Sequence, residues 1–258
     1  MRENRLKTIW SDGGVAIAAG AIVNSTYSAE MVARMGFDAV VIDTQHAPVD
    51  YQMMLGMLQA ISQTPAVPIV RVPWNEPASI MRTLDAGAYA VIGPMINSRK
   101  DCEAFVGACY YAPKGYRSWG PVRGTMYGGP DYFERANDTI LPLVQLETME
   151  SIERADEILS VPGVGGTYIG PGDLAITLGL KPGKSIDDPK LLSAIDRAYE
   201  ACKRHKIPIG IATPNAEWAK TAVAKGAQLI WAGADTGWIN SGGQAALGQF
   251  RKVAGRAE

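Results

Sequence analysis

The chain alternates short apolar runs with longer amphipathic stretches. Eight apolar runs lie at residues 15–22, 38–43, 67–72, 88–94, 141–147, 166–170, 207–212 and 228–233. Between them, apolar residues recur at helical spacing, as in "AEMVARMG", "PASIMRTLDAG" and "KLLSAIDRAYEACKRH". This alternation is typical of βα units built around a parallel sheet.

Glycines punctuate the pattern where a helical stretch gives way to the next apolar run. Gly36, Gly87 and Gly226 stand at such points, which suits a left-handed helix cap. Eight units without an interior linker predict one (β/α)8 barrel domain over residues 1–258, with a doubly wound sheet as the alternative. The stretch 112–130 is unusually long for a connection and predicts a binding loop or a subunit contact.

Composition narrows the class of partner. The chain has 25 Lys and Arg, 26 Asp and Glu, and a formal charge of -1, so it offers no basic surface for nucleic acid. Its apolar runs are too short to cross a bilayer, and "MRENRLKTIW" lacks the apolar stretch of a signal peptide. We expect a cytoplasmic protein with a small-molecule partner, no membrane and no nucleic acid. Three cysteines without CxxC spacing predict buried thiols.

Polar residues gather at the ends of the predicted strands. They are Asp43 and His46 in "IDTQHAP", Arg71 in "IVRVP", Gln145 and Glu147 in "VQLET", and Asp173 in "YIGPGD". Taken singly, each has a structural alternative: a turn residue for His46, an ion pair for Arg71, and a first-turn helix acid for Glu147 or Asp173. A barrel brings the carboxyl ends of its strands to one mouth, so these side chains are expected in one site.

The chemistry of this set favours a hard metal ion. Two carboxylates, Glu147 and Asp173, suit Mg²⁺ or Mn²⁺ and disfavour zinc. A cation beside a guanidinium and an imidazole is suited to stabilising the enolate of a 2-oxo acid. No lysine lies at a predicted strand end, which argues against imine chemistry. His205, at a predicted helix C-terminus, is expected to be structural.

Several motifs in order along the chain resemble the class II pyruvate aldolases. They are "DAVVIDTQHAP", "PIVRVPWNEP", "LDAGAYAVIGPMINS", "YAPKGYRS", "LVQLETMESIERADEILSVPGVGGTYIGPGDLAITLG" and "GADT". These hydroxyketoacid aldolases include 2,4-dihydroxyhept-2-ene-1,7-dioate aldolase and 2-dehydro-3-deoxyglucarate aldolase. The resemblance implies a TIM barrel that reversibly cleaves a 4-hydroxy-2-oxo acid to an aldehyde and pyruvate or a close 2-oxo acid.

The resemblance also assigns roles by position. It implies a divalent metal on Glu147 and Asp173, with Mg²⁺ or Mn²⁺ preferred, Co²⁺ as a further option, and no organic cofactor. Arg71 matches the substrate-binding arginine and donor to the enolate, and His46 the catalytic histidine, with Asp43 orienting its imidazole. The remaining matches are Gln145 beside the oxo acid, Gly170, Pro171, Gly172 and Asp173 around the substrate carboxylate, and Asp85 reaching a neighbouring subunit's site.

Two positions depart from the family pattern. Gln45 stands where many relatives have Glu, which removes a charge beside His46. Arg123 stands where the heptenedioate aldolases have small residues, and it either contacts an acidic or hydroxylated aldehyde or is a solvated loop residue.

The resemblance implies a homo-oligomer, a hexamer built from dimers that exchange the C-terminal helix near residues 243–253. Alternative functions remain open at this point. They are a citramalyl or malyl-CoA-type lyase, a phosphoenolpyruvate-using lyase, and a binding barrel without catalysis.

Overall fold

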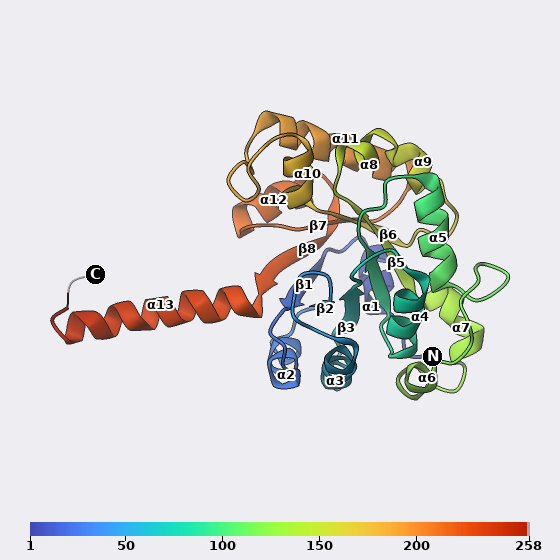
Figure 1. Cartoon of the computed structure of the whole chain (residues 1–258), viewed down its shortest axis with the longest axis horizontal. Helices are drawn as coiled ribbons and strands as arrows, with labels where there is room; N and C mark the ends of the chain where they lie inside the picture. The colour runs from blue at the N-terminus through green and yellow to red at the C-terminus, as the bar shows by residue number, and fades with distance from the viewer. Residues whose placement is uncertain (257–258) are drawn as a thin grey trace.

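Eight parallel strands form a closed barrel in the computed structural model, which describes residues 1–256 (Figure 1). The strands are β1 (Ala16–Ala21), β2 (Ala39–Asp43), β3 (Val67–Arg71), β4 (Ala90–Gly93), β5 (Leu141–Leu146), β6 (Gly166–Ile169), β7 (Ile209–Ile211) and β8 (Ala227–Ala234). Each strand pairs with the next, and β8 pairs with β1 to close the ring. The predicted (β/α)8 barrel is therefore confirmed, and the doubly wound sheet, which would leave two open edges, is excluded.

Helices surround the barrel. They are α1 (Arg5–Ser11), α2 (Thr26–Arg34), α3 (Tyr51–Ile61), α4 (Pro77–Asp85), α5 (Arg99–Cys109), α6 (Val122–Gly128), α7 (Tyr132–Thr139), α8 (Met149–Glu153), α9 (Ala155–Leu159), α10 (Pro171–Thr177), α11 (Pro189–His205), α12 (Ala216–Ala224) and α13 (Asp235–Val253). The predicted loop 112–130 is thus partly wrong, because it contains α6. Gly124 and Gly128, which lower helix propensity, are buried against Tyr132 and permit close packing there.

Local signals in the sequence explain where the helices end. Gly36, Gly87 and Gly226 have φ of +96°, +101° and +112°, a region that favours glycine. The predicted left-handed glycines are therefore confirmed. They turn the chain from each helix directly into the next strand.

Side chains alternate between the inside of the barrel and its helical coat. On β3, for example, Val67 and Ile69 belong to the barrel interior, whereas Val70 packs under the helices. Continuing this alternation places one last inward residue of each strand at the mouth. Those residues include Gly20, Asp43, Arg71, Gln145, Tyr168 and Trp231.

The long helix α13 projects away from the barrel like an arm (Figure 1). Its first turns are fixed: Trp238 stacks on Phe37 with ring centroids 5.5 Å apart, and buried Asp235 accepts hydrogen bonds from the backbone N–H of Ile22 and Val23. Beyond Trp238 most of its side chains are exposed. Within residues 1–256, we find no helix with the length and hydropathy that a bilayer span requires. The three cysteines are buried thiols, as predicted.

Candidate active site

Arg71 and Asp43 form a two-pronged ion pair at the barrel mouth. The residues lie side by side on β3 and β2, and Nε and Nη2 of Arg71 donate to the two Asp43 oxygens over 3.0 and 2.5 Å. Burial lowers the pKa of Arg71, but the hydrogen bond and charge of Asp43 outweigh it, so the pKa is raised. The guanidinium is therefore a fixed, permanent positive charge facing the mouth.

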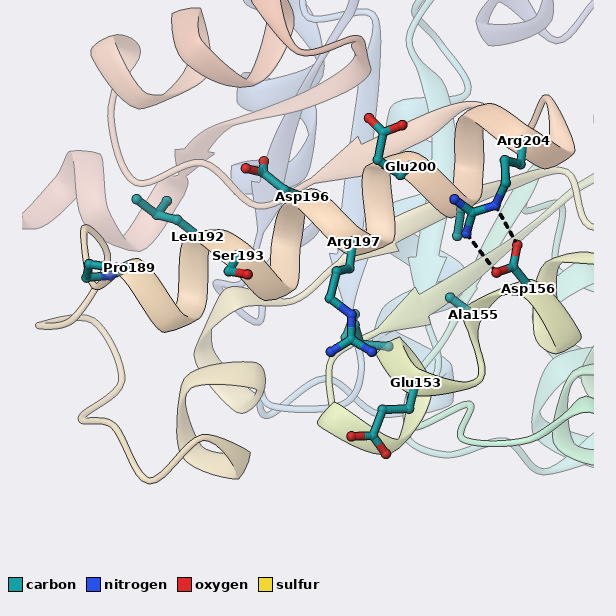
Figure 2. A pocket seen from close by; sticks show the side chains of 12 residues that line it. Glu153, Ala155, Asp156, Pro189, Leu192, Ser193, Asp196, Arg197, Glu200 and Arg204 are labelled. Carbon is teal, nitrogen blue, oxygen red and sulfur yellow. Dashed lines mark hydrogen bonds and ion pairs between the residues drawn. The ribbon is translucent and has the colours of Figure 1, made fainter.

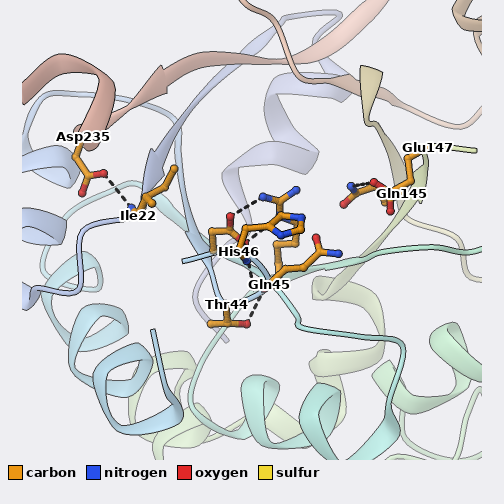
Figure 3. A network of polar contacts seen from close by, with 9 residues as sticks. Ile22, Thr44, Gln45, His46, Gln145, Glu147 and Asp235 are labelled. Carbon is orange, nitrogen blue, oxygen red and sulfur yellow. Dashed lines mark hydrogen bonds and ion pairs between the residues drawn. The ribbon is translucent and has the colours of Figure 1, made fainter. Parts of the chain in front are cut away.

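Asp43 contacts the His46 turn through its backbone. Its Oδ1 accepts the backbone N–H of Gln45 at 3.0 Å and of His46 at 3.3 Å, so the carboxylate shapes the turn while binding Arg71. The strand register sets Arg71 directly opposite Asp43, so the contact of Asp43 with the imidazole itself stays a prediction. The His46 side chain is exposed at the tip of this turn (Figure 3).

Glu147 is a buried carboxylate held from two sides. Its Oε1 accepts the backbone N–H of Met95 at 2.8 Å, and its Oε2 accepts a hydrogen bond from the side-chain amide of Gln145 (Figure 3). Burial, with the nearby charge of Asp173, raises the pKa of Glu147 to about 7. The Glu147 side chain is thus fixed in place, but nearby positive charge does not balance the cost of burying its negative charge.

The chain packs closely against Glu147 where β6 gives way to α10. A Cβ placed on Gly170 would lie 3.0 Å from Glu147 Oε2 and 3.2 Å from Gln145 Nε2, so a larger residue would press on both side chains. Three residues later, half-buried Asp173 lies in the first turn of α10, close enough for its charge to act on Glu147. The fold therefore brings the two predicted metal-binding carboxylates to one place.

The donor set at this place is made of oxygen atoms. Glu147 and Asp173 contribute carboxylates, and Gln145 has a buried Oε1 without a hydrogen-bond partner among the described residues. Across residues 1–256, no group of three or more His, Cys, Asp or Glu side chains is arranged to hold a metal. Two carboxylates and an amide oxygen suit an ion that keeps several waters or substrate oxygens, which is the habit of Mg²⁺.

Gln45, the departure beside His46, has a buried side-chain oxygen with no partner among the described residues. A glutamate in the same position would carry a charge into this confined space. The structure therefore gives a local reason why a neutral side chain is accommodated here.

Arg123 is half-buried on α6 and lies far from this site, so it fits neither predicted role, a substrate contact or a solvated loop residue. Its guanidinium donates to the backbone carbonyls of Ala86 at 2.7 Å and Leu58 at 3.2 Å, at the C-terminal ends of α4 and α3. Barrel helices run opposite to the strands, so these ends lie at the face away from the mouth. Arg123 is bound there because a cation satisfies carbonyls that have no partner within their helix.

Asp85 lies at the same far face, at the end of α4, where Nη2 of buried Arg117 donates to its carboxylate over 2.7 Å. Within one chain it is remote from the mouth, so its predicted contact with a neighbouring subunit's site stays a prediction. His205 is confirmed as a structural residue, since it ends α11 and pairs with Asp156 at 3.0 Å.

A groove of about 630 Å³ lies on the outer layer between α8, α9 and α11 (Figure 2). Its side chains include the Asp156–Arg204 ion pair and other charged residues on exposed helix faces. It contains none of the predicted site residues, and its charges are solvated, so the mouth remains the better candidate site.

The sequence did not single out three residues that shape the mouth. Met95 supplies an N–H to Glu147, while Tyr168 and Trp231 contact each other with ring centroids 6.1 Å apart. The signal for the aromatic pair was present: both residues fall on inward positions of predicted strands. Met95 left no signal, because its contribution comes from the backbone.

Comparison with known proteins supports the resemblance seen in the motifs. A hydroxypyruvate/pyruvate aldolase from Rhizorhabdus wittichii is 37% identical over 97% of this chain and 100% of its own length. A 4-hydroxy-2-oxo-heptane-1,7-dioate aldolase from Klebsiella pneumoniae is 36% identical over 88% of this chain and 86% of its own. Among solved structures, an HpcH/HpaI aldolase/citrate lyase family protein from Burkholderia cenocepacia is 30% identical, with a TM-score of 0.88 over 96% of this chain and 99% of that one.

The family model described as HpcH/HpaI aldolase/citrate lyase matches residues 21–241, which contain every polar residue assigned above to the mouth. The predicted resemblance and the predicted class of enzyme, a carbon–carbon lyase, are both confirmed. On the combined strength of barrel, mouth and matched relatives, the chain belongs to the HpcH/HpaI aldolase/citrate lyase family.

Proposed function

We propose that this enzyme reversibly cleaves a 4-hydroxy-2-oxo acid to an aldehyde and pyruvate, or a close 2-oxo acid, with the help of a divalent metal. The observation that carries the proposal is the pairing, in one mouth, of a fixed guanidinium, Arg71, with a fixed buried carboxylate, Glu147. The positive guanidinium can bind an anionic substrate, and the carboxylate can bind a cation beside it.

Glu147 and Asp173 would hold the metal, and the unpaired oxygen of Gln145 would face it or the bound oxo acid. Mg²⁺ or Mn²⁺ fits this oxygen set, with Co²⁺ as a further option and no organic cofactor. When bound, the ion would supply positive charge beside the 2-oxo group as that group becomes an enolate.

Arg71 would donate hydrogen bonds to the oxygen of the substrate's 2-oxo group. Its guanidinium carries five N–H donors, of which Asp43 uses two, so three remain for the substrate. Because the guanidinium is already fixed, little reorganisation is needed when the oxo oxygen gains negative charge. The backbone N–H groups of Gly172 and Asp173 would meet the substrate carboxylate. The N–H of Gly170 already donates to the carbonyl of Leu146 at 3.1 Å, and Pro171 has none to offer.

His46 would serve as the acid and base. Its exposed imidazole can remove the proton of the C4 hydroxyl as the C3–C4 bond breaks, leaving the aldehyde and an enolate that is then protonated at C3. In the synthetic direction the same ring returns its proton to the new C4 oxygen. Asp43 supports this step through the backbone of the turn and through Arg71.

The test is exchange of the methyl protons of pyruvate in D₂O, followed by NMR with and without Mg²⁺, Mn²⁺ or Co²⁺. We expect metal-dependent exchange that Arg71→Ala reduces by about 100-fold or more, since one oxyanion donor is commonly worth that much. Arg34→Ala, on an exposed helix face, is the matched control and should exchange like the parent.

Absence of exchange, together with no aldol product from any of several aldehydes, would refute the proposal. Turnover of citramalyl-CoA or malyl-CoA, or of phosphoenolpyruvate, without aldehyde turnover would instead assign the chain to the lyases of the same family. If the protein catalyses none of these reactions, the remaining alternative is a barrel that binds a ligand without catalysis.

We further propose that the protein works in the cytoplasm as a homo-oligomer, a hexamer of dimers that exchange α13. The free thiols of its buried cysteines suit a reducing compartment. The projecting α13 leaves an apolar groove of about 440 Å³ on the outer side of β8, next to Ile17, Val223 and Ile230. A barrel normally covers this place with its last helix, so the α13 of a second copy is the occupant that fits.

A further inference from the structure

Trp231 fills a part of the mouth that β1 leaves empty. Gly20 is the last inward residue of β1, and a Cβ built on it would lie 2.8 Å from Cη2 of Trp231 and 2.8 Å from Cβ of Ala234. Real carbon atoms do not approach so closely, so the missing side chain at Gly20 is what allows the indole to lie across β1.

The indole is held in this position by its neighbours. Its ring meets the edge of the Tyr168 ring, and the hydroxyl of Thr213 donates to the backbone carbonyl of Trp231. Tyr168 is also near Arg71, whose charge partly offsets the rise that burial causes in the pKa of the Tyr168 hydroxyl. Trp231 is thus one aromatic ring away from Arg71.

Trp231 also lines a pocket of about 250 Å³. It is lined by Pro171, Gly172, Ala175, Gly183, Ser185, Ile186, Leu191, Ala212, Thr213, Pro214 and Trp231. Pro171 and Gly172 belong to the same helix start that is predicted to surround the substrate carboxylate. The lining contains two hydroxyls and no charged side chain, and the volume is below the roughly 300 Å³ of ordinary ligand pockets.

We infer that Trp231 is a specificity-determining residue, whose indole confines the aldehyde to this pocket and restricts it to short, uncharged chains. The inference rests on the proposed aldolase function. A carboxylate on the aldehyde would be buried without a cation, which is costly, whereas a hydroxyl could bond to Ser185 or Thr213. Arg123, which could have paired with an acidic aldehyde, lies at the opposite face.

Competing aldehydes test the inference, because a ratio of kcat/KM values cancels any general loss of activity. With pyruvate as the donor, the parent should favour propanal and hydroxyacetaldehyde over hexanal and succinic semialdehyde by about 10-fold or more, as one methylene in a tight pocket can be worth that much. Trp231→Phe, Trp231→Leu and Trp231→Ala should raise the hexanal-to-propanal ratio progressively, to about 10-fold or more for Trp231→Ala.

Trp119→Ala is the matched control, because Trp119 is 58% exposed and belongs to an aromatic cluster with Tyr111 and Phe133. Its ratio should equal that of the parent. An unchanged ratio in Trp231→Phe and Trp231→Leu would overturn the inference, as would a parent that prefers succinic semialdehyde. Methyl exchange of pyruvate by the parent needs no aldehyde, so its absence would mark failure of the proposed function rather than of this inference.

Discussion

Arg71 and Asp43 form an ion pair, although the sequence predicted separate roles for them, substrate binding for Arg71 and orientation of His46 for Asp43. Removing one partner of a buried pair leaves an uncompensated charge, typically at a cost of about 3–5 kcal/mol. Asp43 is therefore best understood as the residue that keeps Arg71 fixed, and the His46 turn is formed by the same carboxylate. A change at Asp43 will disturb both functional groups together.

Glu147 gives a prediction for stability against pH. Its pKa in the folded chain is about 7, above its ordinary value of 4.5, so the folded state favours the protonated form. The stability that it contributes is present below about pH 4.5 and is lost as pH rises through 7. In EDTA, urea unfolding should therefore show a free energy that falls between pH 5 and pH 8 by up to about 3 kcal/mol more in the parent than in Glu147→Gln.

Adding Mn²⁺ should reverse this trend in the parent, because the ion binds the deprotonated carboxylate and is favoured at higher pH. Glu147→Gln is the control that keeps the size of the side chain. If the free energy of unfolding has the same pH dependence in the two proteins in EDTA, the pKa of Glu147 is not raised in the folded state.

The sequence predicted which residues lie at the strand ends better than it predicted which side chains they contact. The inward residues at strand ends follow from a period of two, which is why Arg71, Gln145 and Glu147 were found together. The partner of Asp43 depended on the register between β2 and β3, and Arg123 depended on which helix ends it would meet. Neither register nor docking of a loop helix can be obtained from local pattern.

The connection between β4 and α5 helps to hold Glu147 in place. Met95 has φ of +55°, uncommon for a residue with a side chain, and this turns its N–H toward Glu147. Two residues on, Asn97 accepts a hydrogen bond from the Thr148 hydroxyl at 2.6 Å. Two contacts thus tie this connection to the start of the β5–α8 connection, one at Glu147 itself and one at the next residue, Thr148.

Substitution of Met95 tests whether the backbone of this connection positions Glu147. Met95→Gly relieves the backbone strain and keeps the N–H, so Mn²⁺ affinity should stay within about 3-fold and stability should rise by roughly 1 kcal/mol. Met95→Val adds a branched side chain at positive φ, so stability should fall by about 1–3 kcal/mol and Mn²⁺ affinity by about 10-fold.

Calorimetric titration with Mn²⁺ and urea unfolding measure the two effects. Met31→Val, on an exposed face of α2, controls for the change of side chain alone. If Met95→Val binds Mn²⁺ as the parent does, the backbone of this connection does not position Glu147.

Elements were predicted well where the periodicity was long and poorly where glycine interrupted it. The eight strands were predicted to within a few residues, but α6, with two glycines in seven residues, was predicted as part of a loop. The existence of a C-terminal helix could be inferred, whereas its direction away from the barrel could not, because nothing in its own pattern says what it packs against.

At the scale of the whole molecule, the exposed apolar side chains of α13 predict assembly. Ile239, Leu247, Phe250 and Val253 are exposed on a helix that is fixed only at its start. The double substitution Leu247→Asp with Phe250→Asp should reduce the oligomer to smaller species, because it places charge where apolar contact is proposed.

Size-exclusion chromatography with light scattering gives the mass directly. Gln244→Asp with Gln249→Asp adds the same charge to the same helix at polar positions and should keep the parent's mass. A double Leu247 and Phe250 variant with the parent's mass would show that α13 is not the point of exchange.

The pairing of β8 with β1 has a consequence for synthesis of the chain. The barrel closes only when residues 227–234 have been made, so until then β1 and β7 both present unpaired backbone groups along an open edge. A nascent chain that has completed β7 at residue 211 but not β8 therefore has two unpaired strand edges, and domains generally complete folding as units. Ribosome-bound chains that stop before residue 227 should be the ones that aggregate or recruit chaperones, whereas chains that extend past 234 should not.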